Sequence, residues 1–124
     1  MQWVRQTNLD DDNTDKQSTT DTDKKKDDAT MGEKMALDSA ENYLSFMGFS
    51  RKGLIDQLEF EGYTTKEATY AVDNCGADWK EQAVRVAKNY LDTMPFSKKE
   101  LIDQLEFEGF TSEEAEYGVE QAYR

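Results

Sequence analysis

The nine-residue stretch LIDQLEFEG occurs twice in this chain, at residues 54–62 and, letter for letter, at residues 101–109. The offset of 47 residues holds well beyond these nine, because aligning residues 36–75 with residues 83–122 gives 23 identical positions out of 40. The chain therefore contains one small unit used twice. Such duplication is typical of binding proteins with repeated surfaces, and it argues against an enzyme with a single catalytic pocket.

The apolar residues that precede each copy recur at intervals of three and four, which predicts an amphipathic helix. In the first copy the predicted inner face holds Ala36, Ala40, Tyr43, Leu44 and Met47, and in the second it holds Trp79, Ala83, Val86, Ala87, Tyr90, Leu91 and Met94. Each apolar stripe lies on one side of its helix, so other helices of the same unit must pack against that side.

Hydroxyl residues mark the start of the next helix in each copy, at Ser50 and at Ser97. Ser97 is followed three residues later by Glu100, which is the pattern of a capping box. The first copy has Gly53 at that position, so its cap is expected to be weaker. The helix buries Leu54, Ile55 and Leu58 in the first copy and Leu101, Ile102 and Leu105 in the second.

Glycine ends the second helix of each copy, at Gly62 and Gly109, where a left-handed residue costs no Cβ clash. Two further capping boxes, which begin at Thr64 and Thr111, then open a third helix. Its inner face holds Ala68, Ala71, Val72 and Cys75 in the first copy and Ala115, Gly118, Val119 and Ala122 in the second. Asp78, with Glu81 three residues on, caps the helix that starts the second copy.

The predicted fold is all-α, a tandem repeat of two small three-helix units that resemble helix-turn-helix motifs. Residues 1–34 are expected to form a disordered polar spacer, residues 35–76 the first repeat and residues 77–124 the second. A unit of about 40 residues is marginal alone, so the repeats should pack on each other or share a helical junction around residues 76–79. Trp79, which replaces Gly32 of the first repeat, either joins the two repeats or packs only on its own helix.

The chain carries a formal net charge of −12. Residues 1–34 have nine acidic and six basic residues, a net of −3, and residues 35–124 have eighteen and nine, a net of −9. An acidic folded region repels phosphate backbones and anionic lipids and attracts basic partners. The same charge also serves solubility alone, and composition does not separate these two roles.

The residues that most catalytic and metal sites use are scarce here. The chain has no histidine, and its one cysteine, Cys75, is predicted on an inner helix face without a basic neighbour. The acidic run at residues 10–13 lacks the alternate spacing of a calcium loop. We therefore expect no enzyme, no cofactor and no metal site. No apolar run approaches the length of a membrane-spanning helix, and no signal peptide is evident.

Two aromatic residues suggest a surface for a protein partner. On a helical wheel Phe107 lies nearly opposite the Leu101 and Leu105 stripe, beside Asp103, and Phe60 lies likewise in the first repeat. Tyr70 and Tyr117 also fall off the apolar stripes of their helices. Exposed aromatics among acidic residues resemble the anchors and rim of an interface. The alternative is that each middle helix is covered on both sides, which would place Phe60 and Phe107 in the core.

Taken together, the motifs resemble a known family. The pattern A-x3-A-x-N-Y-L, then F-S, then L-I-D-Q-L-x-x-E-G-[YF]-T, occurs twice, with a D-W-x-x-Q-A joint at residues 78–83. This is similar to the Ltp-type host cell surface-exposed lipoproteins of Gram-positive bacteria and their temperate phages. The resemblance covers essentially residues 35–123. It implies extracellular helix-turn-helix repeats that stand on a hydrophilic spacer with an N-terminal lipid anchor.

The resemblance also implies a function. Such proteins act in superinfection exclusion, in which a prophage-encoded protein stops related phages from injecting DNA by binding the tape measure protein. A basic protein partner of this kind is expected here, bound by a monomer at the extracellular face of the membrane. The lipid-bearing cysteine is absent from this chain, so the chain itself is expected to be soluble. The predicted partner-binding residues are Asp103, Glu106, Phe107, Glu113, Glu114, Glu116, Tyr117 and Glu120.

Two other classes of protein remain as alternatives. Met47-Gly48-Phe49 is similar to the loop of ubiquitin-associated domains, which are three-helix adaptors, although the second repeat reads Met94-Pro95-Phe96. A helix-turn-helix shape would also suit a DNA-binding regulator. Its recognition helix would however read KEATYAVDN or EEAEYGVEQ, and the anionic second sequence would be repelled by phosphates rather than release counterions.

Overall fold

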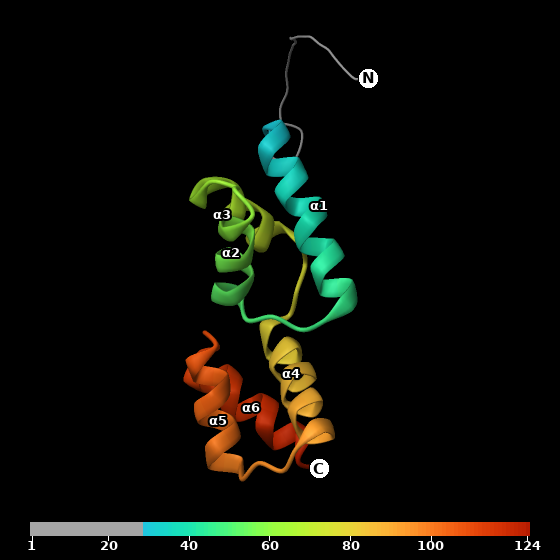
Figure 1. The fold of residues 1–124 in the computed structure, drawn as a ribbon, viewed down its shortest axis with the longest axis vertical. Helices are drawn as coiled ribbons and strands as arrows, with labels where there is room; N and C mark the ends of the chain where they lie inside the picture. Colours follow the sequence, from blue (N-terminus) through green and yellow to red (C-terminus); the bar gives the residue numbers. More distant parts are fainter. Residues whose placement is uncertain (1–28) are drawn as a thin grey trace. The chain divides into compact units, whose positions relative to one another are not determined.

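The computed structural model describes residues 29–124, in which every regular element is an α-helix (Figure 1). In chain order these are α1 (Met31–Phe46), α2 (Arg51–Phe60), α3 (Thr65–Asn74), α4 (Trp79–Thr93), α5 (Lys98–Phe107) and α6 (Ser112–Ala122). The prediction of an all-α tandem repeat is therefore confirmed for these residues. The disordered spacer that was expected over residues 1–34 lies almost wholly outside the described part of the chain.

The helix boundaries follow the caps that the sequence indicates. Capping boxes are present at Ser97, Thr64 and Thr111, whereas Ser50 accepts a bond from the Gly53 amide without a reciprocal glutamate. Asp78 accepts from the amides of Lys80 and Glu81. The glycines that follow α2 and α5 have φ angles of 107° and 109°, a left-handed conformation that glycine adopts without strain.

Each repeat builds its own hydrophobic core from three helices. In the first repeat the buried residues are Ala36, Ala40, Leu54, Leu58, Ala68, Ala71 and Val72. In the second they are Ala83, Val86, Ala87, Leu101, Leu105, Phe110, Ala115 and Val119. Alanine dominates where the first and third helices of each repeat cross, since a small side chain lets the two backbones approach closely. In the second repeat Gly118 packs so closely on α4 that an added Cβ would lie 2.6 Å from the Ala83 Cβ.

Two sequence expectations about the first helix of each repeat are wrong. Met47 and Met94 do not join the core, because α1 ends at Phe46 and α4 at Thr93, and both methionines are about half exposed. The start of α1 also differs from the expected boundary after residue 34, because the helix begins at Met31. Gly32 in its first turn packs against the Glu67 carboxylate at a distance that leaves no room for a Cβ.

The repeats meet through loops and helix ends rather than through long helix faces. Trp79, the first residue of α4, packs against the core of the first repeat, so the expectation that it joins the repeats is confirmed. Three hydrogen bonds accompany it. The Phe49 amide donates to Gln82 Oε1 at 3.3 Å, Arg85 Nη1 donates to the Leu44 carbonyl at 2.6 Å, and Ser50 Oγ donates to the Glu108 carbonyl at 2.7 Å.

Ser50 carries two roles in this junction, and the repeat supplies a matched control. Its hydroxyl caps α2 and also satisfies the Glu108 carbonyl, one of the carbonyls that the end of α5 leaves without a partner in the helix. The equivalent Ser97 is exposed and only caps α5.

We therefore predict that Ser50→Ala lowers the free energy of unfolding more than Ser97→Ala does. Each loses a cap worth about 1 kcal/mol, and Ser50→Ala additionally loses a partly buried hydrogen bond worth about another 1 kcal/mol. Urea unfolding followed by circular dichroism measures both. Equal effects of the two substitutions would show that the Ser50–Glu108 bond contributes nothing to the junction.

Candidate protein-binding surface

Phe60 and Phe107 lie on the outside of the protein. Each side chain is 86% exposed, although both belong to otherwise well-packed helices. The alternative that they are core residues is therefore wrong, because the third helix of each repeat covers only the leucine face of the middle helix. A phenylalanine that is almost fully exposed gains nothing for folding, and its free surface is available to a partner.

Phe107 borders a groove on the outer side of α5, which we name the α4–α5 groove. The groove has a volume of about 510 Å³ and is lined by Met94, Pro95, Phe96, Glu100, Asp103, Gln104 and Phe107. Its apolar lining, which we call its floor, comes from Met94, Pro95, Phe96 and Phe107, and Phe96 packs edge-on against Tyr90 with ring centroids 5.3 Å apart. Its rim carries two carboxylates, Glu100 and Asp103.

The acidic residues predicted on α5 differ in their surroundings. Asp103 forms an ion pair of 2.8 Å with Lys99, one helical turn earlier. This hydrogen bond is the main cause that raises the pKa of Lys99 above its ordinary value. The Glu106 side chain is exposed and makes no hydrogen bond or ion pair with another described residue, although its charge also contributes to the raised pKa of Lys99. The charge of Glu106 is thus available to a partner to a greater extent than that of Asp103, which is partly neutralised by its ion pair with Lys99.

The predicted residues at the start of α6 face the beginning of α4. Glu113 forms an ion pair of 3.2 Å with Lys80, and the same ammonium group lies 5.6 Å from the centre of the Tyr117 ring. The Tyr117 hydroxyl donates to Glu81 Oε2 at 3.2 Å. That bond, with the charge of Glu81, raises the pKa of Tyr117. Tyr117 is half-buried, so it is a weaker candidate for an anchor than Phe107.

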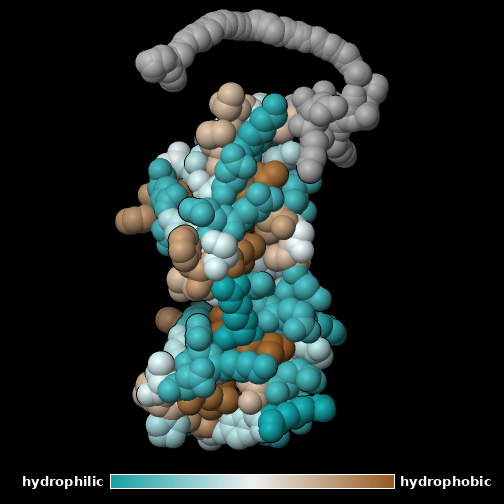
Figure 2. Space-filling view, turned by 90° about the vertical axis from the view of Figure 1, so that its right-hand side faces the viewer, coloured by the Kyte–Doolittle hydropathy of each residue, from teal (hydrophilic) through white to brown (hydrophobic). Residues whose placement is uncertain are grey.

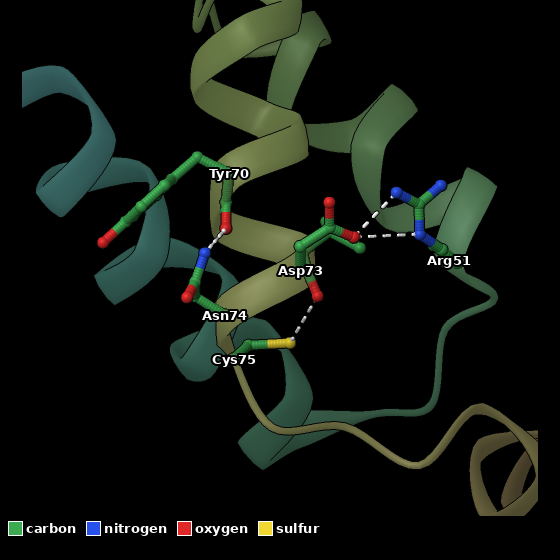
Figure 3. A network of polar contacts seen from close by, with 6 residues as sticks. Arg51, Tyr70, Asp73, Asn74 and Cys75 are labelled. Carbon is green, nitrogen blue, oxygen red and sulfur yellow. Dashed lines mark hydrogen bonds and ion pairs between the residues drawn. The ribbon is translucent and has the colours of Figure 1, made fainter. Parts of the chain in front are cut away.

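An ion pair at the end of α6 has a counterpart in the first repeat. Lys98 pairs with Glu120 at 3.2 Å, and the residues 47 positions earlier, Arg51 and Asp73, pair at 2.7 Å. Figure 3 shows this first pair, with the Arg51 guanidinium directed at the Asp73 carboxylate from the start of α2. Since both repeats use it to tie the second helix to the third, the charge of Glu120 serves the fold.

The remaining two predicted residues lie on α6 with opposite roles. Glu114 accepts the Thr111 amide at 3.0 Å and is therefore the glutamate of a capping box. Glu116 is exposed, and its side chain has no hydrogen-bonding or ionic partner among residues 29–124. Of the eight predicted residues, Glu106, Phe107 and Glu116 are thus the ones that the fold leaves unused.

The structure does not join the eight residues into one local cluster. Asp103 and Phe107 share the α4–α5 groove, whereas Glu113 and Tyr117 share contacts with Lys80 and the start of α4. Sequence reasoning missed the partners Lys80, Lys98 and Lys99, and it missed the groove. The repeat offset offers a signal for two of the pairs, because Lys98 and Glu120 align with Arg51 and Asp73, and Lys99 and Asp103 with Lys52 and Asp56.

Other kinds of site find little support in the described residues. No group of three or more acidic or cysteine side chains within residues 29–124 is arranged to hold a metal ion. None of the six helices is long and apolar enough to cross a bilayer. Figure 2 shows hydrophilic side chains over most of one face, with separate hydrophobic patches between them. Such a mixed surface suits a protein partner better than a lipid tail or a nucleic acid.

Comparison with known proteins places the chain in a family. The family model of the host cell surface-exposed lipoproteins matches twice, over residues 32–75 and residues 78–121. These two matches span most of the chain, and each covers three helices. The chain belongs to the family of host cell surface-exposed lipoproteins.

The chain is also similar to one solved member of this group. That structure is Ltp, a superinfection exclusion protein from the Streptococcus thermophilus temperate phage TP-J34. The two are 37% identical with a TM-score of 0.70, and the match covers 74% of this chain and 96% of that chain. No curated protein sequence matches the chain.

The raised pKa of Tyr117 gives a prediction for spectroscopic titration. We expect Glu81→Gln to lower the Tyr117 pKa toward about 10, because it removes the negative charge that opposes ionisation of the phenol. Ultraviolet absorbance at alkaline pH measures the change, and Tyr117→Phe identifies which transition belongs to this residue. An unchanged titration in Glu81→Gln would contradict the contact between Glu81 and Tyr117.

The raised pKa of Tyr117 also determines how the free energy of unfolding changes with pH. A tyrosine whose pKa is higher in the folded state binds its proton more tightly there, so its contribution is complete below about pH 10 and is lost as the pH rises through the folded-state pKa. The free energy of unfolding of Tyr117→Phe should therefore decrease less steeply above about pH 10 than that of the wild type.

Proposed function

We propose that this protein acts in superinfection exclusion, by binding the tape measure protein of an incoming phage and thereby blocking DNA injection. Family membership and the 37% identity to the Ltp superinfection exclusion protein carry this proposal. The protein would act at the extracellular face of the host membrane, held there as a lipoprotein. The residues that precede α1 would form the polar spacer between the anchor and the repeats, a role that their composition suits.

The surface chemistry supports a basic protein partner. The second repeat has nine acidic and four basic residues over residues 83–122, and the first has seven and three over residues 36–75. The side chains of Glu106 and Glu116 add to this excess without forming an ion pair within the described residues. A basic segment of the phage protein would meet an excess of negative charge on α5 and α6, which accelerates association and selects for basic partners.

The same charges weigh against the DNA-binding alternative. If the fold were a helix-turn-helix regulator, α6 would be its recognition helix, and its outward positions hold Glu113, Glu116 and Glu120. Each of these carboxylates would oppose a phosphate rather than release a counterion. An adaptor of the ubiquitin-associated kind has no observation in its favour here beyond the loop at residues 47–49.

The test of the charge contribution uses residues that the fold does not need. We predict that Glu106→Lys with Glu116→Lys, in a membrane-anchored form, lowers protection against the excluded phage by about tenfold or more, the effect expected when a complementary field is reversed. Plating efficiency on cells that express each variant measures protection. Pull-down with the purified phage tape measure protein measures binding directly, and raised salt should weaken that binding.

A charge-matched control separates local from overall electrostatics. Asp38→Lys with Glu41→Lys makes the same change of net charge on the exposed side of α1, in the first repeat. This control should keep full protection. Equal loss of protection in both double variants would show that the overall charge of the protein matters rather than a local docking surface. Full protection by the Glu106 and Glu116 variant would show that these charges do not contribute to binding.

A further inference from the structure

We propose that the α4–α5 groove of the second repeat binds the C-terminal turn of a basic amphipathic helix in the phage partner. The anchor is an aromatic or large aliphatic side chain of that turn, which lies against Met94, Phe96 and Phe107. This inference rests on the proposed function, since it specifies which part of the surface takes the partner and what chemistry the partner presents.

The first repeat shows what this kind of groove holds. Its equivalent surface lies along Met47, Phe49, Gly53 and Asp56, and the end of α5 completes its lining with Phe107 and Glu108, so that Phe107 borders both surfaces. There the Ser50 hydroxyl donates to the Glu108 carbonyl at 2.7 Å, and the next residue, Gly109, packs so closely that an added Cβ would lie 2.9 Å from the Lys52 Cβ. The protein therefore already uses this surface to receive the C-terminal turn of a helix.

In the second repeat the same surface is open. The residues that line the α4–α5 groove all come from the second repeat, so no other part of the described chain fills it. Met94 is 53% exposed, and Ser97, the counterpart of the buried Ser50, is exposed. The Ser97 oxygen accepts from the Glu100 amide at 3.1 Å, and its hydrogen remains available for a carbonyl such as the one that Ser50 binds.

A second copy of this chain does not fit the open groove. The junction depends on Gln82 and Arg85 as well as on Ser50, and the residues 47 positions earlier are Met35 and Asp38. In a head-to-tail copy these two residues would face the backbone of the second repeat, where Met35 offers no polar side chain and Asp38 would oppose a carbonyl. Two of the three junction hydrogen bonds would be lost.

Position 95 separates the two grooves further. Its counterpart Gly48 lies so close to α4 that a Cβ there would sit 2.8 Å from Val86 Cγ2, whereas position 95 is a proline. The ring of Pro95 gives the open groove an extra apolar wall where the first repeat needs empty space. The groove of the second repeat is thus shaped for a side chain rather than for another repeat.

The charges on the groove determine the character of the helix that would bind. Glu100 and Asp103 lie on the rim, and Glu106 lies one residue before Phe107 on the same helix. An apolar anchor flanked by lysine or arginine satisfies both the floor and the rim. A basic side chain in the last turn of a helix is also favoured by the negative end of the helix dipole.

The experiment compares two phenylalanines in identical nine-residue sequences. Phe107→Ser and Met94→Ser alter the groove, and Phe60→Ser is the control, because Phe60 is equally exposed but does not line the groove. Peptides that tile the tape measure protein of an excluded phage are titrated into each variant, and the same variants are tested for protection in the membrane-anchored form. Circular dichroism verifies that each remains folded.

We expect Phe107→Ser and Met94→Ser to weaken peptide binding and protection by about tenfold or more, the effect of losing a central anchor, and Phe60→Ser to change both less than about twofold. If a peptide that binds the wild type also binds both groove variants equally well, the groove is not the binding site, while the proposed function stands. Equal damage by Phe60→Ser would also overturn it. A wild type that binds no tape measure peptide and gives no protection would instead refute the proposed function.

One further outcome concerns self-association. If sedimentation shows that the wild type forms dimers and that Met94→Ser abolishes them, the groove is occupied by a second copy and the proposal of a helical partner is wrong.

Discussion

Each three-helix unit of this protein is too small to stabilise itself by its own burial, and the rest of the structure follows from that constraint. The fully buried side chains are mainly alanine and leucine, so each core is thin. Trp79 relieves the shortage by adding a large aromatic from the start of the second repeat to the core of the first. The junction is therefore part of the folding unit, and it fixes which surfaces remain for a partner.

The sequence predicts the local structure well because its signals are local. Capping boxes, left-handed glycines and helical apolar spacing each depend on residues within a few positions of one another, and all of them place the helix boundaries correctly from α2 onward. The start of α1 was missed because its first turn has no apolar stripe. The offset of 47 residues would have found it, since Asp78 and Trp79 align with Met31 and Gly32.

The candidate site was harder to predict, because the role of a charge depends on its neighbours in space. Glu113, Glu116 and Glu120 look alike in the sequence, yet the fold pairs the first with Lys80 and the third with Lys98 and leaves the second unpaired. A helical wheel places Phe107 opposite the leucines but does not reveal whether another helix covers it. The groove could not be predicted from the sequence pattern, because its residues come from three segments, the end of α4, a loop and α5.

The sequences of α2 and α5 are the same over most of their length, and this affects the route by which the chain folds. Either helix offers the same leucines to either core, so an early collapse can place one where the other belongs, a kinetic trap typical of tandem repeats. The links within a repeat span only a few residues, and closing so short a loop has a smaller entropic cost than reaching across to the other copy. Proximity along the chain, rather than side-chain chemistry, keeps each helix with its own repeat.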